Sequence, residues 1–169
     1  MKNIVNMALL ILLSTLLLSH KQIPTYLTHH SEKYKYSIMY PSSFQIKENI
    51  NGTDFHAADG LGGSVVTYPM ILSDKNDNSA FEMTDQEIKE GTNRIFKQTH
   101  EVVSIKRGVI DNTNRLVVVI ETNEGKFIVC TLKKSVSNPQ LQLTMACKKA
   151  DFEKYKQPFF DIMKSFKVN

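Results

Sequence analysis

Four strand-like segments follow one another in the second half of the chain, and only short turns connect them. The segments are residues 101–110, 115–122, 126–134 and 140–149, and the turns between them are rich in Asn, Asp and Gly. Neighbouring parallel strands need a crossover of about a dozen residues or more, which none of these turns can supply. The sequence therefore predicts an antiparallel meander, and this feature most restricts the folds open to the chain.

The second of these segments is apolar on both faces. Residues 116–120 are Leu-Val-Val-Val-Ile, and successive side chains of a strand point to opposite sides of the sheet. A strand of this kind belongs in the middle of a sheet that is covered on both faces. We therefore expect packed elements on each side of the meander.

A helix is predicted over residues 84–99, since Thr84 and Glu87 have the spacing of a capping box. Its core-facing stripe, at helical spacing, is Ile88, Gly91, Thr92, Ile95 and Phe96. A glycine inside a helix costs about 1 kcal/mol relative to alanine. We therefore expect Gly91 to lie where the helix closely approaches a sheet.

A second helix is predicted over residues 151–166. Its apolar stripe, at spacings of three and four, is Phe152, Tyr155, Phe159, Ile162, Met163 and Phe166. Pro158 lies inside this pattern and removes a backbone hydrogen bond, so we expect it to kink or split the helix.

Shorter strands are predicted in the first half of the chain, where alternating segments lie between turn signals. Their ranges are 34–40, 44–48, 54–58 and 64–71, and a polar loop follows at 73–80. Asn51-Gly52 is a strong signal for a hairpin turn. The predicted fold class is α+β: an antiparallel β-sheet, made of the meander and N-terminal hairpins, covered by helices.

The first nineteen residues have the pattern of a secretory signal. Lys2 precedes an apolar run at residues 7–18, and Ser19 is a small residue suited to the position before a cleavage site. The run is short for a membrane span, which needs about 20 apolar residues. We expect a cleaved signal at 1–19, a polar linker at 20–33, and an exported protein in the periplasm or outside the cell. An uncleaved N-terminal membrane anchor is the alternative.

Two segments resemble PsbP-like domains. Residues 36–44, Tyr-Ser-Ile-Met-Tyr-Pro-Ser-Ser-Phe, are similar to the opening of these domains, although Phe44 stands where bacterial members often have Trp. Residues 159–167, Phe-Phe-Asp-Ile-Met-Lys-Ser-Phe-Lys, are similar to their closing helix. The order of predicted elements between the two segments also agrees. The resemblance implies one domain at 34–169 with an α/β/α sandwich around an antiparallel sheet.

The same resemblance implies a class of function. PsbP-like proteins include an extrinsic subunit of photosystem II, a nuclear-import factor that binds the GTPase Ran, and many exported bacterial proteins. They are mostly binding modules rather than enzymes. None of their functional residues maps onto this sequence, so the resemblance assigns no site residue here.

Cys130 and Cys147 lie on the last two strands of the predicted meander. A turn centred between Asn138 and Pro139 sets them opposite each other, with both thiols on one apolar face. In an exported protein they would form a cross-strand disulfide. The alternative is two buried thiols that act as small hydrophobic side chains. A redox-catalytic role is not indicated, because the chain has no Cys-x-x-Cys motif.

Asp54, His56 and Asp59 are the best candidates for a metal ligand set or a general base. Asp54 and His56 are two apart on a predicted strand and therefore share a face. A metal site needs three or four converging ligands, and no third ligand is identified. An ordinary surface histidine is the alternative for His56.

Two further segments have a superficial likeness to binding motifs. His29-His30-Ser31-Glu32 would bind a transition metal weakly, but it falls in the predicted linker. Gly60-Leu61-Gly62-Gly63-Ser64 lacks the Lys-Ser/Thr end of a phosphate loop and precedes a strand, so it predicts a hairpin turn.

Two classes of function remain. The chain has 21 Lys and Arg residues against 17 Asp and Glu, a scattered excess of +4 that gives no reason to expect a nucleic-acid partner. We expect an exported, non-catalytic binding or accessory module that needs no cofactor and binds a protein or a small molecule. Membrane contact would come only through an unprocessed N-terminal segment. The alternative is a hydrolase or a metal-dependent enzyme that uses Asp54, His56 and Asp59.

Overall fold

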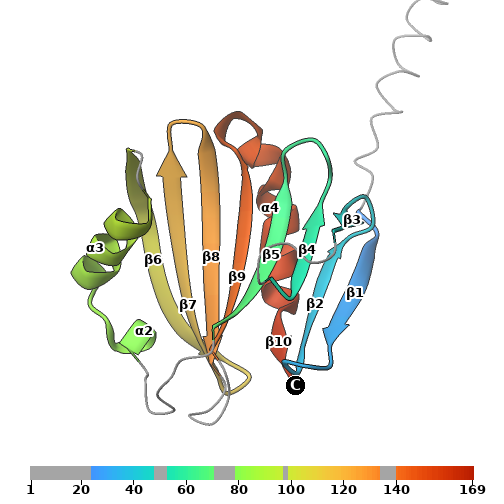
Figure 1. Ribbon diagram of the computed structural model, residues 1–169, viewed down its shortest axis with the longest axis horizontal. Coiled ribbons are helices and arrows are strands. Elements are labelled where there is room, and N and C mark those ends of the chain that lie inside the picture. The colour runs from blue at the N-terminus through green and yellow to red at the C-terminus, as the bar shows by residue number, and fades with distance from the viewer. Residues whose placement is uncertain (1–23, 48–52, 71–78, 97–98, 134–139) are drawn as a thin grey trace, which may run out of the picture.

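The computed structural model describes residues 24–47, 53–70, 79–96, 99–133 and 140–169, so the predicted signal at 1–19 lies outside the described part. Within that part the chain forms two antiparallel sheets (Figure 1). The larger sheet has the order β3-β4-β5-β9-β8-β7-β6, and its strands are β3 (Gln45–Ile46), β4 (Phe55–Ala58), β5 (Ser64–Met70), β6 (His100–Ile110), β7 (Thr113–Thr122), β8 (Gly125–Lys133) and β9 (Gln140–Lys148).

The smaller sheet has the order β1-β2-β10, and its strands are β1 (Tyr26–Ser31), β2 (Tyr36–Pro41) and β10 (Lys167–Val168). The helices are α2 (Ser79–Glu82), α3 (Asp85–Ile95) and α4 (Phe152–Ser165), the last preceded by a 3-10 turn at Lys149–Asp151. No helix in the described part of the chain is both long and apolar enough to cross a membrane.

The predicted meander is confirmed. β6, β7, β8 and β9 pair in chain order, and β5 pairs with the other side of β9. Asp111 and Asn112 close the β6–β7 hairpin with positive φ angles of 50° and 55°, a region that Asp and Asn tolerate better than most residues. β6 is the edge strand, and its register shifts between Val102 and Ser104.

Both faces of β7 are covered, as its sequence predicts, although β7 lies next to the edge strand rather than at the centre of the sheet. Leu116, Val118 and Ile120 are buried on one face together with Ile88 of α3. Val117, on the other face, packs against the core beneath α4. The helices α3 and α4 therefore lie on opposite faces of the larger sheet, α3 toward its β6 end and α4 toward β9 and β5 (Figure 1).

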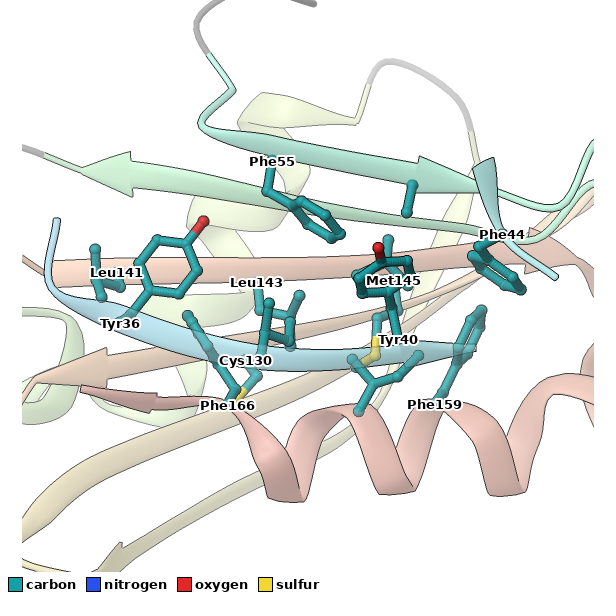
Figure 2. Packing of buried hydrophobic residues seen from close by; sticks show 14 of the residues in the cluster. Tyr36, Tyr40, Phe44, Phe55, Cys130, Leu141, Leu143, Met145, Phe159 and Phe166 are labelled. Atoms are coloured by element: carbon teal, nitrogen blue, oxygen red, sulfur yellow. The ribbon is translucent and has the colours of Figure 1, made fainter. Parts of the chain in front are cut away.

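The main core lies between α4, β2 and the larger sheet. Figure 2 shows that aromatic side chains from β2 and α4 meet the apolar face of the sheet strands in this layer. The most deeply buried members are Tyr36, Ile38, Ala57, Val65, Cys130, Leu132, Leu141, Leu143, Met145, Phe159, Ile162 and Phe166. The small sheet thus contributes its second strand to the same core as the large one.

α4 runs unbroken through Pro158, so of the two predicted outcomes, a kink or a split, the split is wrong. The buried stripe explains why, because Tyr155 lies before Pro158 and Phe159 and Ile162 lie after it, all in the core. Tertiary packing of an apolar face outweighs local helix propensity in most protein helices. The sequence resemblance that marked this segment as a closing helix is correct.

The predicted capping box of α3 is confirmed: the Glu87 N–H donates to Thr84 Oγ1 at 3.2 Å, and the Thr84 N–H donates to Glu87 Oε2 at 2.7 Å. The helix ends at Ile95, which is 76% exposed instead of packing on the sheet as predicted. Gly91 does not mark a close approach either. A Cβ there would meet only Met83 Cε, at 4.0 Å, so Gly91 borders open space.

The predicted linker at 20–33 is wrong in its second half, because residues 26–31 form β1 and pair along the whole of β2. β1 is an edge strand of which only Ser31 is buried. With so little apolar surface to bury, its sequence shows no clean alternation. The alternation of apolar and polar residues therefore does not reveal this strand.

The predicted register of the two cysteines is also wrong. Cys130 pairs with Leu143, and Cys147 pairs with Lys126, so the cysteines lie four residues apart along the strands, about 13 Å at 3.3 Å per residue. Both thiols are free and buried. They belong to the same core cluster, which confirms that they share a face. Burial raises the pKa of each thiol to about 11.

We predict that Phe159→Ala destabilises the protein by about 3–5 kcal/mol, because it removes a fully buried aromatic ring from the core beneath α4. Lys156→Ala is the matched control on the exposed side of the same helix and should cost less than about 0.5 kcal/mol. Urea denaturation followed by circular dichroism measures both. Equal midpoints for the two variants would contradict the assigned helix face.

Candidate functional site

Asp54, His56 and Asp59 are not brought together by the structure. Asp54 precedes β4 and Asp59 follows it, and the extended strand between them places their Cα atoms about 16 Å apart at 3.3 Å per residue. The His56 side chain alternates with the buried Phe55 and Ala57, so it points away from the core. Its pKa is lowered by burial and by the charge of Lys47.

Asp54 belongs instead to a polar cluster on the core side of β4. Its carboxylate accepts a hydrogen bond of 2.7 Å from the Tyr36 hydroxyl, whose oxygen lies 2.6 Å from Thr67 Oγ1. His29 Nε2 is 4.0 Å from the same carboxylate, and the His29 ring stacks on Phe55 with 4.4 Å between ring centroids. Burial lowers the pKa of His29 although Asp54 opposes this.

The His29-His30-Ser31-Glu32 segment does not converge on a metal site. His29 turns to Asp54, whereas the His30 side chain is exposed. Among the described residues, no group of three or more His, Cys, Asp or Glu side chains is placed to hold a metal ion. The sequence does not reveal the proximity of His29 to Asp54, because its pattern predicts a linker where His29 lies in strand β1.

Asp59 holds the Gly-rich segment as a turn, as the sequence predicts. Its Oδ1 accepts the N–H groups of Leu61 at 2.8 Å and Gly63 at 3.0 Å, and its Oδ2 accepts the Tyr155 hydroxyl of α4. A Cβ at Gly63 would lie 2.5 Å from Tyr155 Cε1, so glycine is required there. Asp59 therefore ties the β4–β5 turn to α4, which is a structural role.

A groove separates α4 from the β6 end of the larger sheet, and we call it the α4 groove. It holds about 500 Å³ between β6–β8 and the side of α4, and a second hollow of about 480 Å³ continues it toward the end of α4. The two hollows share Lys106, Val117, Phe160 and Met163. The floor is apolar, and Phe160 is 45% exposed at its wall.

Among the described residues, the charged side chains along the α4 groove that have no ion-pair partner are mainly positive, and Asp111 is the acidic exception. Lys106, Lys164 and Lys167 line it, and within the described part of the chain none of them has a carboxylate partner. Lys164 Nζ lies 4.6 Å from the centroid of the Phe160 ring. Of the two acidic residues beside the groove, Glu153 is already 3.5 Å from Lys156.

Arg115 of β7 fixes the end of the α4 groove. Its guanidinium is buried and donates to the carbonyls of Met163 at 2.9 Å and Phe166 at 3.0 Å. These carbonyls lie at the C-terminal end of α4, where helix carbonyls have no partner within the helix. The positive charge also complements the helix dipole. Arg115 therefore holds α4 at a set distance from β7.

A separate hollow lies beneath α3 on the opposite face of the larger sheet, and we call it the α3 cleft. It holds about 400 Å³. Apolar side chains of β7 and β8 and polar side chains of β8 and β9 form its floor, and α3 forms its roof. Among the residues that line it are Gly91, Thr131, Gln140, Gln142 and Thr144, and none of the lining residues within the described part of the chain is charged.

We predict that Asp59→Asn destabilises the protein at neutral pH but much less in acid. Burial pushes the pKa of Asp59 upward, but hydrogen bonds from Tyr155, Leu61 and Gly63 outweigh it and hold the pKa below its ordinary value. A carboxylate with a lowered pKa stabilises the fold above its unfolded pKa of about 3.9 and loses that effect as the pH falls through the folded value.

The measurement is the urea midpoint of both proteins from neutral pH down to a pH of about 2, well below the unfolded pKa. Asp111→Asn, in an exposed turn with a positive φ that Asn also tolerates, is the matched control. A difference between Asp59→Asn and the unaltered protein that stays constant over the whole range would contradict the role given to the carboxylate.

Comparisons with known proteins identify the fold. No family model matches the sequence, and no curated protein matches it. Among solved structures, cyanobacterial PsbP from Synechocystis sp. PCC 6803 superposes with a TM-score of 0.63 at 12% sequence identity, over 89% of this chain and 96% of that chain. The Ran-binding protein Mog1p of Saccharomyces cerevisiae superposes with a TM-score of 0.57 at 8% identity, over 86% of this chain and 96% of that chain.

Both likenesses extend over most of each chain, and at such low identity they concern the fold. They agree with the antiparallel sheets, with the helices on opposite faces, and with the sequence resemblance at residues 36–44 and 159–167. The chain therefore has the α/β/α sandwich fold that cyanobacterial PsbP and Mog1p share.

Proposed function

We propose that this protein is an exported binding or accessory module and that it binds an acidic protein partner in the α4 groove. The observation that carries the proposal is an apolar groove with exposed lysines at its rim. Phe160 is 45% exposed and Ile110 is 52% exposed, although both are large apolar side chains. Apolar surface gathered in a concave site and rimmed by polar groups is typical of interaction surfaces.

The positive charge around the groove favours a negatively charged partner. Lys106, Lys164 and Lys167 line the same hollow as Phe160, with Lys164 over its ring, and have no carboxylate partner within the described residues. Complementary charge speeds the encounter of two proteins and excludes partners of the same sign. A surface with carboxylates around one apolar side chain would match the groove, with the apolar side chain against Phe160 and Met163.

The shared fold supports this class of function. Mog1p is a Ran-binding protein, so the same fold serves protein recognition elsewhere. The enzyme alternative has no such support, because the described residues do not bring Asp54, His56 and Asp59 together. We therefore base the proposed function on the α4 groove alone.

Export is the first test of the proposal. We predict that the exported protein begins near His20, because Lys2, the apolar run at 7–18 and Ser19 have the pattern of a cleaved signal. Cell fractionation followed by N-terminal sequencing measures this. Intact Met1 in a soluble cytosolic fraction would contradict export, and intact Met1 in a membrane fraction would indicate the uncleaved anchor.

The second test concerns the groove. We predict that Lys164→Glu with Lys167→Glu reduces recovery of the native partner by at least about tenfold, since each reversed charge opposes an acidic surface. The measurement is affinity capture from the exported fraction of the native organism, followed by quantitative mass spectrometry.

The matched control is Lys89→Glu with Lys47→Glu, which changes the net charge equally at exposed positions outside the groove. The proposal requires a captured protein that the control variant retains and the groove variant loses. Equal recovery by both variants would contradict it.

A further inference from the structure

We propose that the α3 cleft is a second binding site, for a neutral and mostly apolar small molecule that carries one hydrogen-bond donor. This site is independent of the proposed function, because α3 and the α4 groove lie on opposite faces of the larger sheet. The cleft holds about 400 Å³, which lies within the range of about 300–1,000 Å³ that is common for small-molecule sites.

The Gln140 side chain supplies the polar end of the site. Gln140 is 2% exposed, lines the cleft, and has an amide oxygen that is buried without a hydrogen-bond partner in the described part of the chain. Buried carbonyl oxygens in folded proteins almost always have a donor. An N–H or O–H group of a bound molecule would supply one.

The side chains that line the cleft determine the charge and polarity of a suitable ligand. The described residues of the lining include no Asp, Glu, Lys, Arg or His side chain, so a charged ligand would lose its hydration without gaining a counter-ion from them. The hydroxyl of Thr92 in the roof already donates to the Ile88 carbonyl at 2.8 Å. The roof therefore offers mainly apolar contact, and recognition of a polar group falls to Gln140 and its neighbours on the sheet.

The cleft is held open by contacts at both ends of α3. At the start of the helix, Arg107 of β6 donates to Asp85 at 2.6 Å and to the Met83 carbonyl at 2.7 Å. Just after the end of the helix, Phe96 meets Phe127 edge to face, with 5.3 Å between ring centroids. The helix thus spans the cleft between two anchored ends.

Gly91 keeps the middle of this span empty. Glycine destabilises a helix interior relative to alanine, and here no close approach to the sheet accounts for it. A Cβ at this position would meet nothing nearer than Met83 Cε at 4.0 Å. A larger side chain would project into the cleft, so Gly91 preserves the volume that a ligand needs.

The test uses N-phenyl-1-naphthylamine, a neutral, apolar fluorescent molecule with one N–H donor, titrated into the protein purified as exported. We expect saturable binding that Gly91→Leu weakens at least tenfold. Gly108→Leu is the matched control, because Gly108 lies in the α4 groove and also has nothing within 4 Å of its Cβ position. We expect it to leave the affinity unchanged.

A second comparison isolates the hydrogen bond and covers the case in which Gly91→Leu fails to fold. The unaltered protein should prefer the N–H probe over its N-methyl derivative by about fivefold, the value of one ordinary hydrogen bond. Gln140→Met, which keeps the size of the side chain without the acceptor, should abolish that preference.

Several results would overturn the proposal. They are the absence of saturable binding to the unaltered protein, equal affinity of the unaltered and Gly91→Leu proteins, loss of binding with Gly108→Leu instead, or a preference for the N–H probe that persists in Gln140→Met. Loss of binding with Gly108→Leu would place the probe in the α4 groove, and none of these results tests an acidic protein partner there, so the proposed function is tested separately.

Discussion

The two apolar faces of β7 are the constraint on which the rest of the structure depends. Leu116, Val118 and Ile120 point to one side of the sheet, and Val117 and Val119 point to the other. Burying a side chain of this size is worth about 1.5–3 kcal/mol, so neither face can be left to water. α4 with β2 covers one face and α3 covers the other, and both covers are incomplete: α4 leaves a groove on the β6 side, and a hollow over β7, β8 and β9 remains under α3. The α4 groove and the α3 cleft are the two places where this coverage stops.

Much of the fold was predictable because its signals are local. The meander follows from short turns, the start of α3 from a capping box four residues long, and α4 from a stripe that packs as expected. The predictions that were wrong concern features that depend on distant parts of the chain. The β8–β9 register depends on how Leu132 meets Leu141 rather than on the Asn138-Pro139 signal. β1 became a strand only because β2 was available to pair with it, and Ile95 was exposed because α3 ends there.

The candidate sites were less predictable for the same reason. Asp54, His56 and Asp59 are close in sequence, yet an extended strand holds near neighbours apart and turns alternate side chains to opposite faces. The groove lysines come from β6, from the end of α4 and from β10, which no local pattern connects. The sequence pattern does not distinguish Gln140 from other strand residues, because its place in the cleft depends on α3. Gly91 gave the one usable signal, since a glycine on a buried stripe indicated something unusual, although the reason was space rather than close contact.

The packing of β2 between α4 and the larger sheet has a kinetic consequence. Met39 of β2 hydrogen-bonds Ser165 of α4 at 2.8 Å across 126 positions of sequence, and Tyr36 meets Phe166 edge to face in the same core. Contacts this distant pay a large loop-closure entropy before they return any stability, and proteins dominated by them fold slowly. A chain emerging from the ribosome cannot complete the main core until the segment containing α4 has been made. During that interval β2 has no completed core to pack against.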